Sequence, residues 1–199
     1  MTAIAKALYY FRKLKKPVVI PSYEEKRADL LFYKNKYSLQ TFVETGTFLG
    51  DTVDFFKDKF DKVYSIELSE ELAQKATRRF TGDPNVKIIQ GDSGIVLKEL
   101  IASFSAPAMF WLDGHYSSEF FVNGEYIKTA KADKDTPIEK ELSFLLHSSF
   151  QHVILIDDAR LFTGLGDYPS LRTIRKMTRT AKHAYDCFVE KDIIHIIPR

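Results

Sequence analysis

Cysteine is almost missing from this sequence, since Cys187 is the one example among 199 residues. A single cysteine excludes an internal disulfide framework and any zinc or iron–sulfur site built from several cysteines. Glycine contributes only 9 residues and heptad repeats are lacking, which excludes collagen-like and coiled-coil chains. No stretch reaches the roughly 20 apolar residues that a membrane-spanning helix requires. The composition is 45% hydrophobic and 28% charged, which indicates a globular protein with a full core.

An excess of charge of one sign is lacking as well. The formal net charge is +2, too small to indicate a nucleic-acid partner. The first 16 residues are an exception, because they are basic, contain no acid and place apolar residues at helical spacing. This segment either packs on the domain or makes a weak peripheral contact with an anionic surface. Lys6 interrupts its apolar run, so we expect no secretory leader and a cytoplasmic protein.

The pattern along the chain divides it into two regions. Residues 1–40 are expected to form a helical arm, with a second helix at about 23–37. Residues 41–199 are expected to form an α/β domain, because short apolar runs alternate with amphipathic helical segments. We expect strands at 41–44, 62–67, 86–90, 108–113, 152–157, 184–190 and 193–198. We expect helices at about 52–60, 70–80, 93–104, 137–148 and 171–182.

This alternation predicts a doubly wound, mostly parallel sheet with helices on both faces. The last two strands must form a C-terminal antiparallel hairpin, because only Lys191 and Asp192 separate them. Two connections are long, at 116–135 and 161–170, and the first contains Asn123-Gly124, which is typical of a small β-hairpin. Long loops at one end of a parallel sheet usually cover a ligand.

Ligands of open α/β sheets bind beyond the carboxyl ends of the strands, so the residues delivered there are the candidates. The first strand is followed by Glu44-Thr45-Gly46-Thr47-Phe48-Leu49-Gly50, which is either a structural turn or a ligand loop. Glu67 follows about 20 residues later and either accepts hydrogen bonds from two ribose hydroxyls or acts as a helix-dipole charge. Asp92 either caps the next helix or accepts from an adenine amine.

Together these motifs, with Trp111-Leu112-Asp113 at the end of the fourth strand, resemble the class I S-adenosylmethionine-dependent methyltransferases over about 41–199. The resemblance implies a seven-stranded sheet with the last strand inserted antiparallel. It also implies that Glu44 and Gly46 lie near the methionine part of the cofactor, Glu67 at the ribose and Asp92 near the adenine. The cofactor-binding residues that we expect are Glu44, Thr45, Gly46, Thr47, Gly50, Glu67, Leu68, Asp92, Ser93 and Asp113.

Three carboxylates are expected to meet at the reaction centre, because Asp113 ends the fourth strand and Asp157-Asp158 ends the fifth. Carboxylates in one cleft repel unless they are protonated or joined by a cation, and Mg²⁺ suits such oxygen ligands best. This arrangement resembles the metal-dependent O-methyltransferases of the catechol and macrocin types, the second more closely. We therefore expect a divalent metal held by Asp113, Asp157 and Asp158, and methyl transfer to a hydroxyl of a small, sugar-like or natural-product acceptor.

Neighbouring residues complete this hypothesis. The catalytic residues that we expect are Asp113, Asp157 and His115. His115 would act as a base, and the alternatives are a hydrogen bond that holds its loop or metal ligation. Tyr116 and Arg160 would contact the substrate, although an internal ion pair with Asp157 or Asp158 is the favoured interpretation for Arg160. Two alternatives stay open. One is a non-haem metal oxygenase on the same fold, and the other is a cofactor-binding module or an RNA methyltransferase that uses the basic arm.

Overall fold

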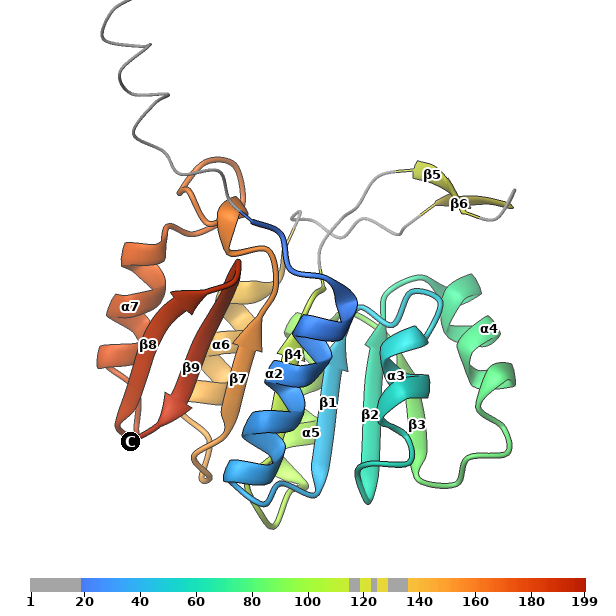
Figure 1. Cartoon of the computed structure of the whole chain (residues 1–199), viewed down its shortest axis with the longest axis horizontal. Helices are drawn as coiled ribbons and strands as arrows, with labels where there is room; N and C mark the ends of the chain where they lie inside the picture. Colours follow the sequence, from blue (N-terminus) through green and yellow to red (C-terminus); the bar gives the residue numbers. More distant parts are fainter. Residues whose placement is uncertain (1–18, 115–118, 123–124, 129–135) are drawn as a thin grey trace, which may run out of the picture.

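The computed structural model of the chain describes residues 19–114, 119–122, 125–128 and 136–199, with the backbone alone for 119–122 and 125–128. Its centre is a seven-stranded sheet in the order β3-β2-β1-β4-β7-β9-β8 (Figure 1). The strands are β1 (Thr41–Thr45), β2 (Lys62–Glu67), β3 (Val86–Gln90), β4 (Met109–Leu112), β7 (Val153–Ile156), β8 (Tyr185–Glu190) and β9 (Ile193–Pro198). A separate antiparallel pair is formed by β5 (Glu119–Val122) and β6 (Glu125–Lys128).

The direction of the strands places the candidate residues on one side of the molecule. β3, β2, β1, β4 and β7 are parallel, and β9 lies antiparallel between β7 and β8. The parallel strands therefore end at one edge of the sheet, here called the carboxyl edge, and begin at the opposite, amino edge. The strand order changes direction between β1 and β4, and ligands of such sheets bind at this switch point.

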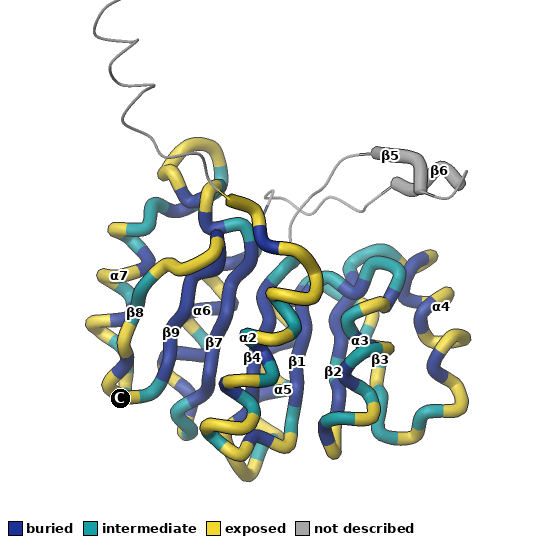
Figure 2. Tube along the Cα trace, in the orientation of Figure 1, coloured by how far each residue is buried: buried dark blue, intermediate teal, exposed yellow. Residues whose placement is uncertain are grey.

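Helices cover both faces of the sheet, because neighbouring residues of each central strand point in opposite directions. In β1, Phe42 packs with α2 (Tyr23–Lys36) and α3 (Asp51–Phe56), whereas Val43 packs with α5 (Ser93–Ala102) and α6 (Ile138–Leu146). α7 (Leu171–Arg179) lies on the face of α5 and α6 through Ile174, and α4 (Glu70–Arg79) lies beside β3 (Figure 1). Figure 2 shows that the central strands are buried along their length.

Short polar side chains fix where the helices begin. Ser22 and Glu25 form a reciprocal capping box at α2, with the Ser22 hydroxyl accepting from the Glu25 N–H at 3.2 Å and the Glu25 carboxylate accepting from the Ser22 N–H at 2.8 Å. Ser69 caps α4 and Ser170 caps α7. The start of α2 lies at the carboxyl edge (Figure 1), so its first turn is placed near the candidate site.

The predicted sheet is confirmed, including the C-terminal antiparallel hairpin, and each strand bound agrees within one residue. The helices end one to four residues earlier than predicted, because their last turns tighten into i→i−3 bonds such as Lys59 N–H to Phe56 O. Leu30 and Tyr33 of α2 are buried in the core, while residues 1–18 of the predicted arm lie outside the described residues. None of the described helices is long and apolar enough to cross a membrane.

Candidate functional site

The glycine loop after β1 is held tightly against the end of β4. Gly46 has a φ of +91°, which side-chain-bearing residues rarely adopt, and a Cβ there would lie 2.7 Å from the Asp113 carbonyl oxygen. The Gly46 N–H donates to Ile66 O at 2.9 Å, and the Asp113 N–H donates to Thr45 O at 3.1 Å. The loop thus begins at the switch point of the sheet, where the lack of a side chain at Gly46 lets the end of β4 approach the loop backbone.

Glu44 lies beneath this loop as a fully buried carboxyl group. Its Oε2 accepts from the Ser65 hydroxyl at 2.7 Å, and the same hydroxyl lies 2.7 Å from that of Thr47. Burial raises the pKa of Glu44 to about 8; the Ser65 hydrogen bond opposes this shift, and the charge of Asp113 adds to it. Glu44 therefore carries a proton at neutral pH and holds the loop through neutral hydrogen bonds.

Glu67, at the end of β2, presents its carboxylate to the same loop. Its Oε2 accepts a hydrogen bond from the Phe48 N–H at 2.9 Å, and its Oε1 accepts one from the Ser69 N–H at 2.9 Å. Leu68 lies between Glu67 and Ser69 in the chain. Each carboxylate oxygen has two acceptor positions, so each keeps one for a further donor. Two free acceptor positions side by side suit the neighbouring hydroxyls of a ribose.

Asp92 caps α5, because its Oδ1 accepts from the Gly94 N–H at 2.8 Å. This is one of the two roles that the sequence left open, and the adenine contact stays a prediction. Ser93, the next residue, is buried, and a hydrogen bond from its hydroxyl opposes the rise that burial causes in the pKa of Glu141 in α6. Glu141 is a residue that the sequence did not single out.

Glu141 is the second buried carboxyl group of the site. Neither the Glu141 Oε1 nor the Thr45 hydroxyl has a hydrogen-bond partner among the described residues. Burial raises the pKa of Glu141 to about 7, although the Ser93 hydroxyl opposes the shift. A small cavity of about 10 Å³, bordered by Glu141, Gly114 and Asp157, opens beside them. A polar donor is therefore expected at this point.

The predicted aspartates do come together at the ends of β4 and β7. Burial, followed by the charge of Asp113, raises the pKa of Asp157 to about 6. The Asp157 Oδ2 is hydrogen-bonded to the ammonium of Lys26, from α2, and its Oδ1 accepts from the Asp158 N–H at 2.8 Å. Lys26 is a second residue that the sequence did not single out, since 131 positions separate it from its partner.

Arg160 shows the internal pairing that the sequence allowed. Its guanidinium lies 2.7 Å from Asp158 Oδ1 and also pairs with the buried Asp192. A contact between Arg160 and the substrate stays a prediction. His115 and Tyr116, the expected base and substrate contact, lie outside the described residues.

The carboxylates do not suit a divalent metal as they are arranged. Mg²⁺ needs several oxygen ligands in a near-octahedral set. Asp157 is instead bound by an ammonium, and Asp158 by a guanidinium. Across the described ranges, no group of three His, Cys, Asp or Glu side chains is placed to hold a metal ion. The geometry therefore does not support the magnesium site expected at Asp113, Asp157 and Asp158.

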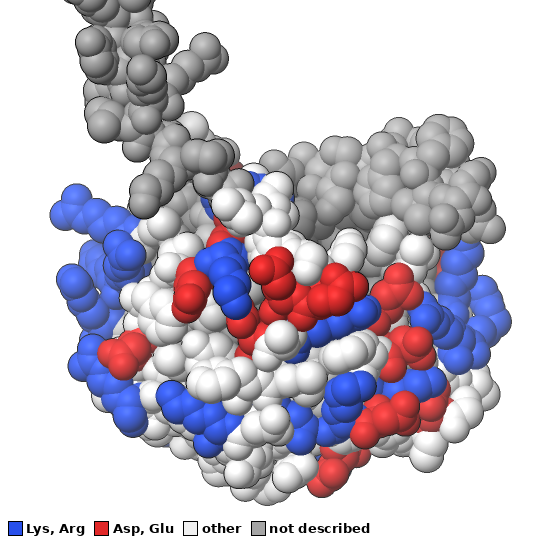
Figure 3. Space-filling model, viewed as in Figure 1, with Lys and Arg blue, Asp and Glu red and all other residues white. Residues whose placement is uncertain are grey.

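Apart from Lys26 and Arg160, which pair with the aspartates of the site, basic side chains gather elsewhere on the surface. Figure 3 shows groups of Lys and Arg side chains at two ends of the molecule, over α7 and α4, with further ones scattered over the face between them. In α7 they are the exposed Arg172, Arg175, Lys176 and Arg179. The site itself is rich in carboxyl groups, which would repel a phosphate backbone.

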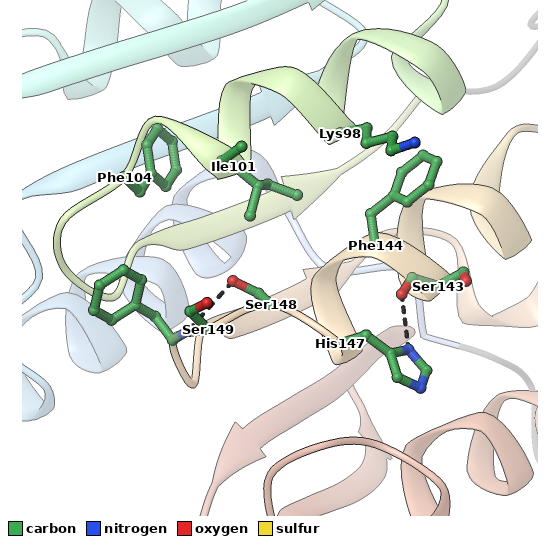
Figure 4. Close-up of a pocket in the computed structure, with 10 residues that line it drawn as sticks. Lys98, Ile101, Phe104, Ser143, Phe144, His147, Ser148 and Ser149 are labelled. Atoms are coloured by element: carbon green, nitrogen blue, oxygen red, sulfur yellow. Dashed lines mark hydrogen bonds between the residues drawn. The ribbon is translucent and has the colours of Figure 1, made fainter.

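A larger hollow of about 850 Å³ lies elsewhere, between α5 and α6 (Figure 4). Phe104, Phe144 and Ile101 line it, together with Lys98 and the exposed His147. The predicted site residues do not border it, so its size does not make it the candidate site.

Comparison with known proteins supports the fold. No protein-family model matches the sequence, and no curated protein matches it significantly. Among solved structures, the chain is similar to the O-methyltransferase TomG from Streptomyces achromogenes, with 16% identity, a TM-score of 0.57, and 100% of this chain and 91% of that chain covered. An O-methyltransferase from Bacillus cereus is 14% identical, with a TM-score of 0.56, and the match covers 98% of this chain and 90% of that chain. The 23S rRNA methyltransferase ErmE is 15% identical, with a TM-score of 0.50, and the match covers 87% of this chain and 68% of that chain. The chain therefore has the class I methyltransferase fold, which is shared by enzymes with different acceptors.

Proposed function

We propose that this chain is an S-adenosylmethionine-dependent methyltransferase that methylates a hydroxyl group of a small, sugar-like or natural-product acceptor. The observation that carries the proposal is the joint position of the Gly46 loop and the Glu67 carboxylate at the switch point of a class I methyltransferase fold. TomG is described as an O-methyltransferase of tomaymycin synthesis in complex with S-adenosylmethionine, and the Bacillus cereus enzyme was solved with the demethylated product. These neighbours favour the same cofactor here.

The described residues fit this cofactor by their chemistry. Glu67 offers acceptor positions for the ribose hydroxyls, and the lack of a side chain at Gly46 lets the loop lie directly against the end of β4. Asp92 and Ser93 at the start of α5 are proposed for the adenine, with the unpartnered Glu141 oxygen nearby as a further acceptor. Glu44 is proposed to support the loop on the methionine side as a neutral acid.

The residues of the chain act mainly by alignment. S-adenosylmethionine, when bound, supplies a methyl group that is already activated by the positive sulfur. Holding the acceptor oxygen in line with that methyl group can contribute up to roughly 7–11 kcal/mol through effective concentration. Asp113 and Asp157, at neighbouring strand ends, are proposed to border this position. His115 is proposed to accept the hydroxyl proton as the acceptor oxygen bonds to the methyl carbon; the bond between that carbon and sulfur would break, and its electron pair would stay on the sulfur of the departing S-adenosylhomocysteine.

Metal assistance is left out of this proposal, because basic side chains of the chain itself occupy Asp157 and Asp158. An extended nucleic-acid acceptor is disfavoured by the carboxyl-rich edge. A non-haem oxygenase is supported by no particular contact among the described residues.

Titration calorimetry with S-adenosylhomocysteine tests the cofactor half of the proposal. Glu67→Ala is expected to raise the Kd tenfold or more, by about 1.5–3 kcal/mol, because charge-assisted hydrogen bonds are lost. Glu71→Ala is the matched control, since Glu71 is an exposed acid on α4 that pairs with Lys75 at 3.0 Å. Equal affinities in the wild type and Glu67→Ala would refute the placement of the ribose.

Transfer of a radiolabelled methyl group tests the acceptor half. Purified protein is incubated with methyl-labelled S-adenosylmethionine and separate pools of small hydroxylated molecules, RNA and protein. Label in a base-stable product among the small molecules is expected, as methyl ethers resist mild alkali and esters do not. Label confined to RNA or to protein would overturn the proposed acceptor class.

A further inference from the structure

Lys26 is directed into the carboxyl edge by the way α2 begins and packs. The Ser22–Glu25 capping box fixes the first turn, and Lys26 follows directly. Lys26, Leu30 and Tyr33 are spaced at i, i+4 and i+7, so they share one face of the helix. Leu30 and Tyr33 are buried in the core against the sheet. This face therefore carries the Lys26 side chain toward the ends of β4 and β7.

The ammonium of Lys26 lies among all three predicted metal ligands. It is hydrogen-bonded to Asp157, and its side chain keeps 15% of its exposure while that of Asp157 keeps 6%. Burial lowers the pKa of Lys26, but Asp157, Asp113 and Asp158 outweigh burial and the net pKa is raised. The ammonium therefore binds Asp157 directly, and the negative charges of Asp113 and Asp158 act on it as well.

We propose that the Lys26 ammonium takes the place of a divalent cation in the aspartate cluster, so that Lys26 is a positioning residue of a site that works without bound metal. Its role in methyl transfer rests on the proposed function, whereas its role as the cation of the cluster does not. The ammonium and a metal ion would compete for the same Asp157 Oδ2. Arg160 supplies the second positive charge, on Asp158. Lys26 and Arg160 thus bring two positive charges to the cluster, and Arg160 shares its charge between Asp158 and Asp192.

Competition of this kind has a readout that needs neither the acceptor nor catalysis. Titration with Mn²⁺, followed by the loss of the free-ion signal in electron paramagnetic resonance, reports metal binding directly. The wild type is expected to bind Mn²⁺ no more tightly than about 1 mM, the range of weak oxygen sites. Lys26→Met frees the carboxylates and is expected to bind Mn²⁺ at least tenfold more tightly than the wild type.

Two controls separate charge from position. Lys26→Arg keeps a cation beside Asp157 and is expected to behave like the wild type. Lys34→Met removes a lysine from the same helix, where its ammonium lies 5.2 Å from the Phe60 ring centre, and is expected to change nothing. Tight Mn²⁺ binding by the wild type that Asp157→Asn abolishes would overturn the proposal, even if Lys26→Met fails to fold. Unimproved binding by a folded Lys26→Met would overturn it as well.

The proposed function can fail separately. Absence of S-adenosylhomocysteine binding to the wild type would refute the methyltransferase, yet it would leave the Mn²⁺ result unchanged. Binding of that product by both the wild type and Lys26→Met, with Mn²⁺ gained only by the variant, is the outcome expected if both are right.

Discussion

The two edges of the sheet treat buried polar groups in opposite ways. At the amino edge, His152 is completely buried and fully hydrogen-bonded. Its Nδ1 accepts from the Ala108 N–H at 3.0 Å, its Nε2 lies 2.8 Å from the Ser148 hydroxyl, and its backbone N–H donates to the Tyr185 hydroxyl at 3.1 Å. This network joins the starts of β4, β7 and β8. It is what a buried polar group requires for stability.

At the carboxyl edge, the hydrogen bonds of equally buried groups are incomplete. Glu44 and Glu141 are carboxyl groups with raised pKa values, and both have acidic neighbours. The Thr45 hydroxyl and one Glu141 oxygen are without partners among the described residues. Groups of this kind lower stability, and they collect where a site binds ligands. The contrast therefore assigns structure to the amino edge and function to the carboxyl edge.

The largest expected effect that would test this contrast is at Glu44. Its pKa of about 8 exceeds the ordinary value of 4.5, so the folded protein is favoured below pH 4.5 and loses stability as the pH rises toward 8. The loss is about 4 kcal/mol at pH 7.5. Glu44→Gln is always neutral, so it should be more stable than the wild type by up to this amount at pH 7.5 and equal to it at pH 4. Urea unfolding at both pH values measures the difference.

Glu99→Gln is the matched control for that experiment. Glu99 is an exposed acid on α5, and its replacement should change stability little at either pH. If the wild type and Glu44→Gln lose the same stability as the pH rises, burial does not raise the pKa of Glu44 and the contrast between the two edges is wrong.

The next effect is at the amino edge and has the opposite sign. Burial, followed by the charge of His183, lowers the pKa of His152 to about 4, below the ordinary 6.5. Stability is therefore complete above pH 6.5 and falls as the pH drops toward 4, by about 3 kcal/mol. His152→Gln should be less stable at pH 7 but should lose less than the wild type between pH 6.5 and 4. Replacement of the exposed His147 by Gln is the control and should leave the loss of stability between pH 6.5 and 4 unchanged. An equal loss in His152→Gln and the wild type would show that His152 is not the buried group that titrates.

The fold could be predicted because its signals are local. Alternating short apolar runs and amphipathic segments identified every strand of the sheet, and the Lys191-Asp192 link fixed the direction of the last pair. Glu67 and Gly46 could be singled out for the same reason, since a strand end and a turn are visible in a few neighbouring residues. Sequence periodicity thus carries information about elements and their ends.

The charge balance of the site could not be predicted, because it depends on contacts between distant segments. Three aspartates at two strand ends suggested a metal, and nothing in the neighbouring sequence shows that Lys26 reaches them across 131 positions. Glu141 was missed because an acid in an amphipathic helix usually faces solvent, whereas α5 packs over this one. Pattern analysis locates charged residues, but packing decides which charges meet.

The smallest expected effect compares the loss of one hydroxyl at each edge. Ser148→Ala removes the partner of His152 Nε2 and of the Phe150 N–H, so it should lower the free energy of unfolding by about 1–2 kcal/mol. Thr45→Val keeps the shape of a side chain whose hydroxyl makes no hydrogen bond with the described residues, so it should leave stability unchanged or raise it by about 1 kcal/mol. Urea unfolding without cofactor at pH 7.5 measures both variants. Equal destabilisation by the two substitutions would show that Thr45 has a structural partner, and the difference between the edges would then rest on the carboxyl groups alone.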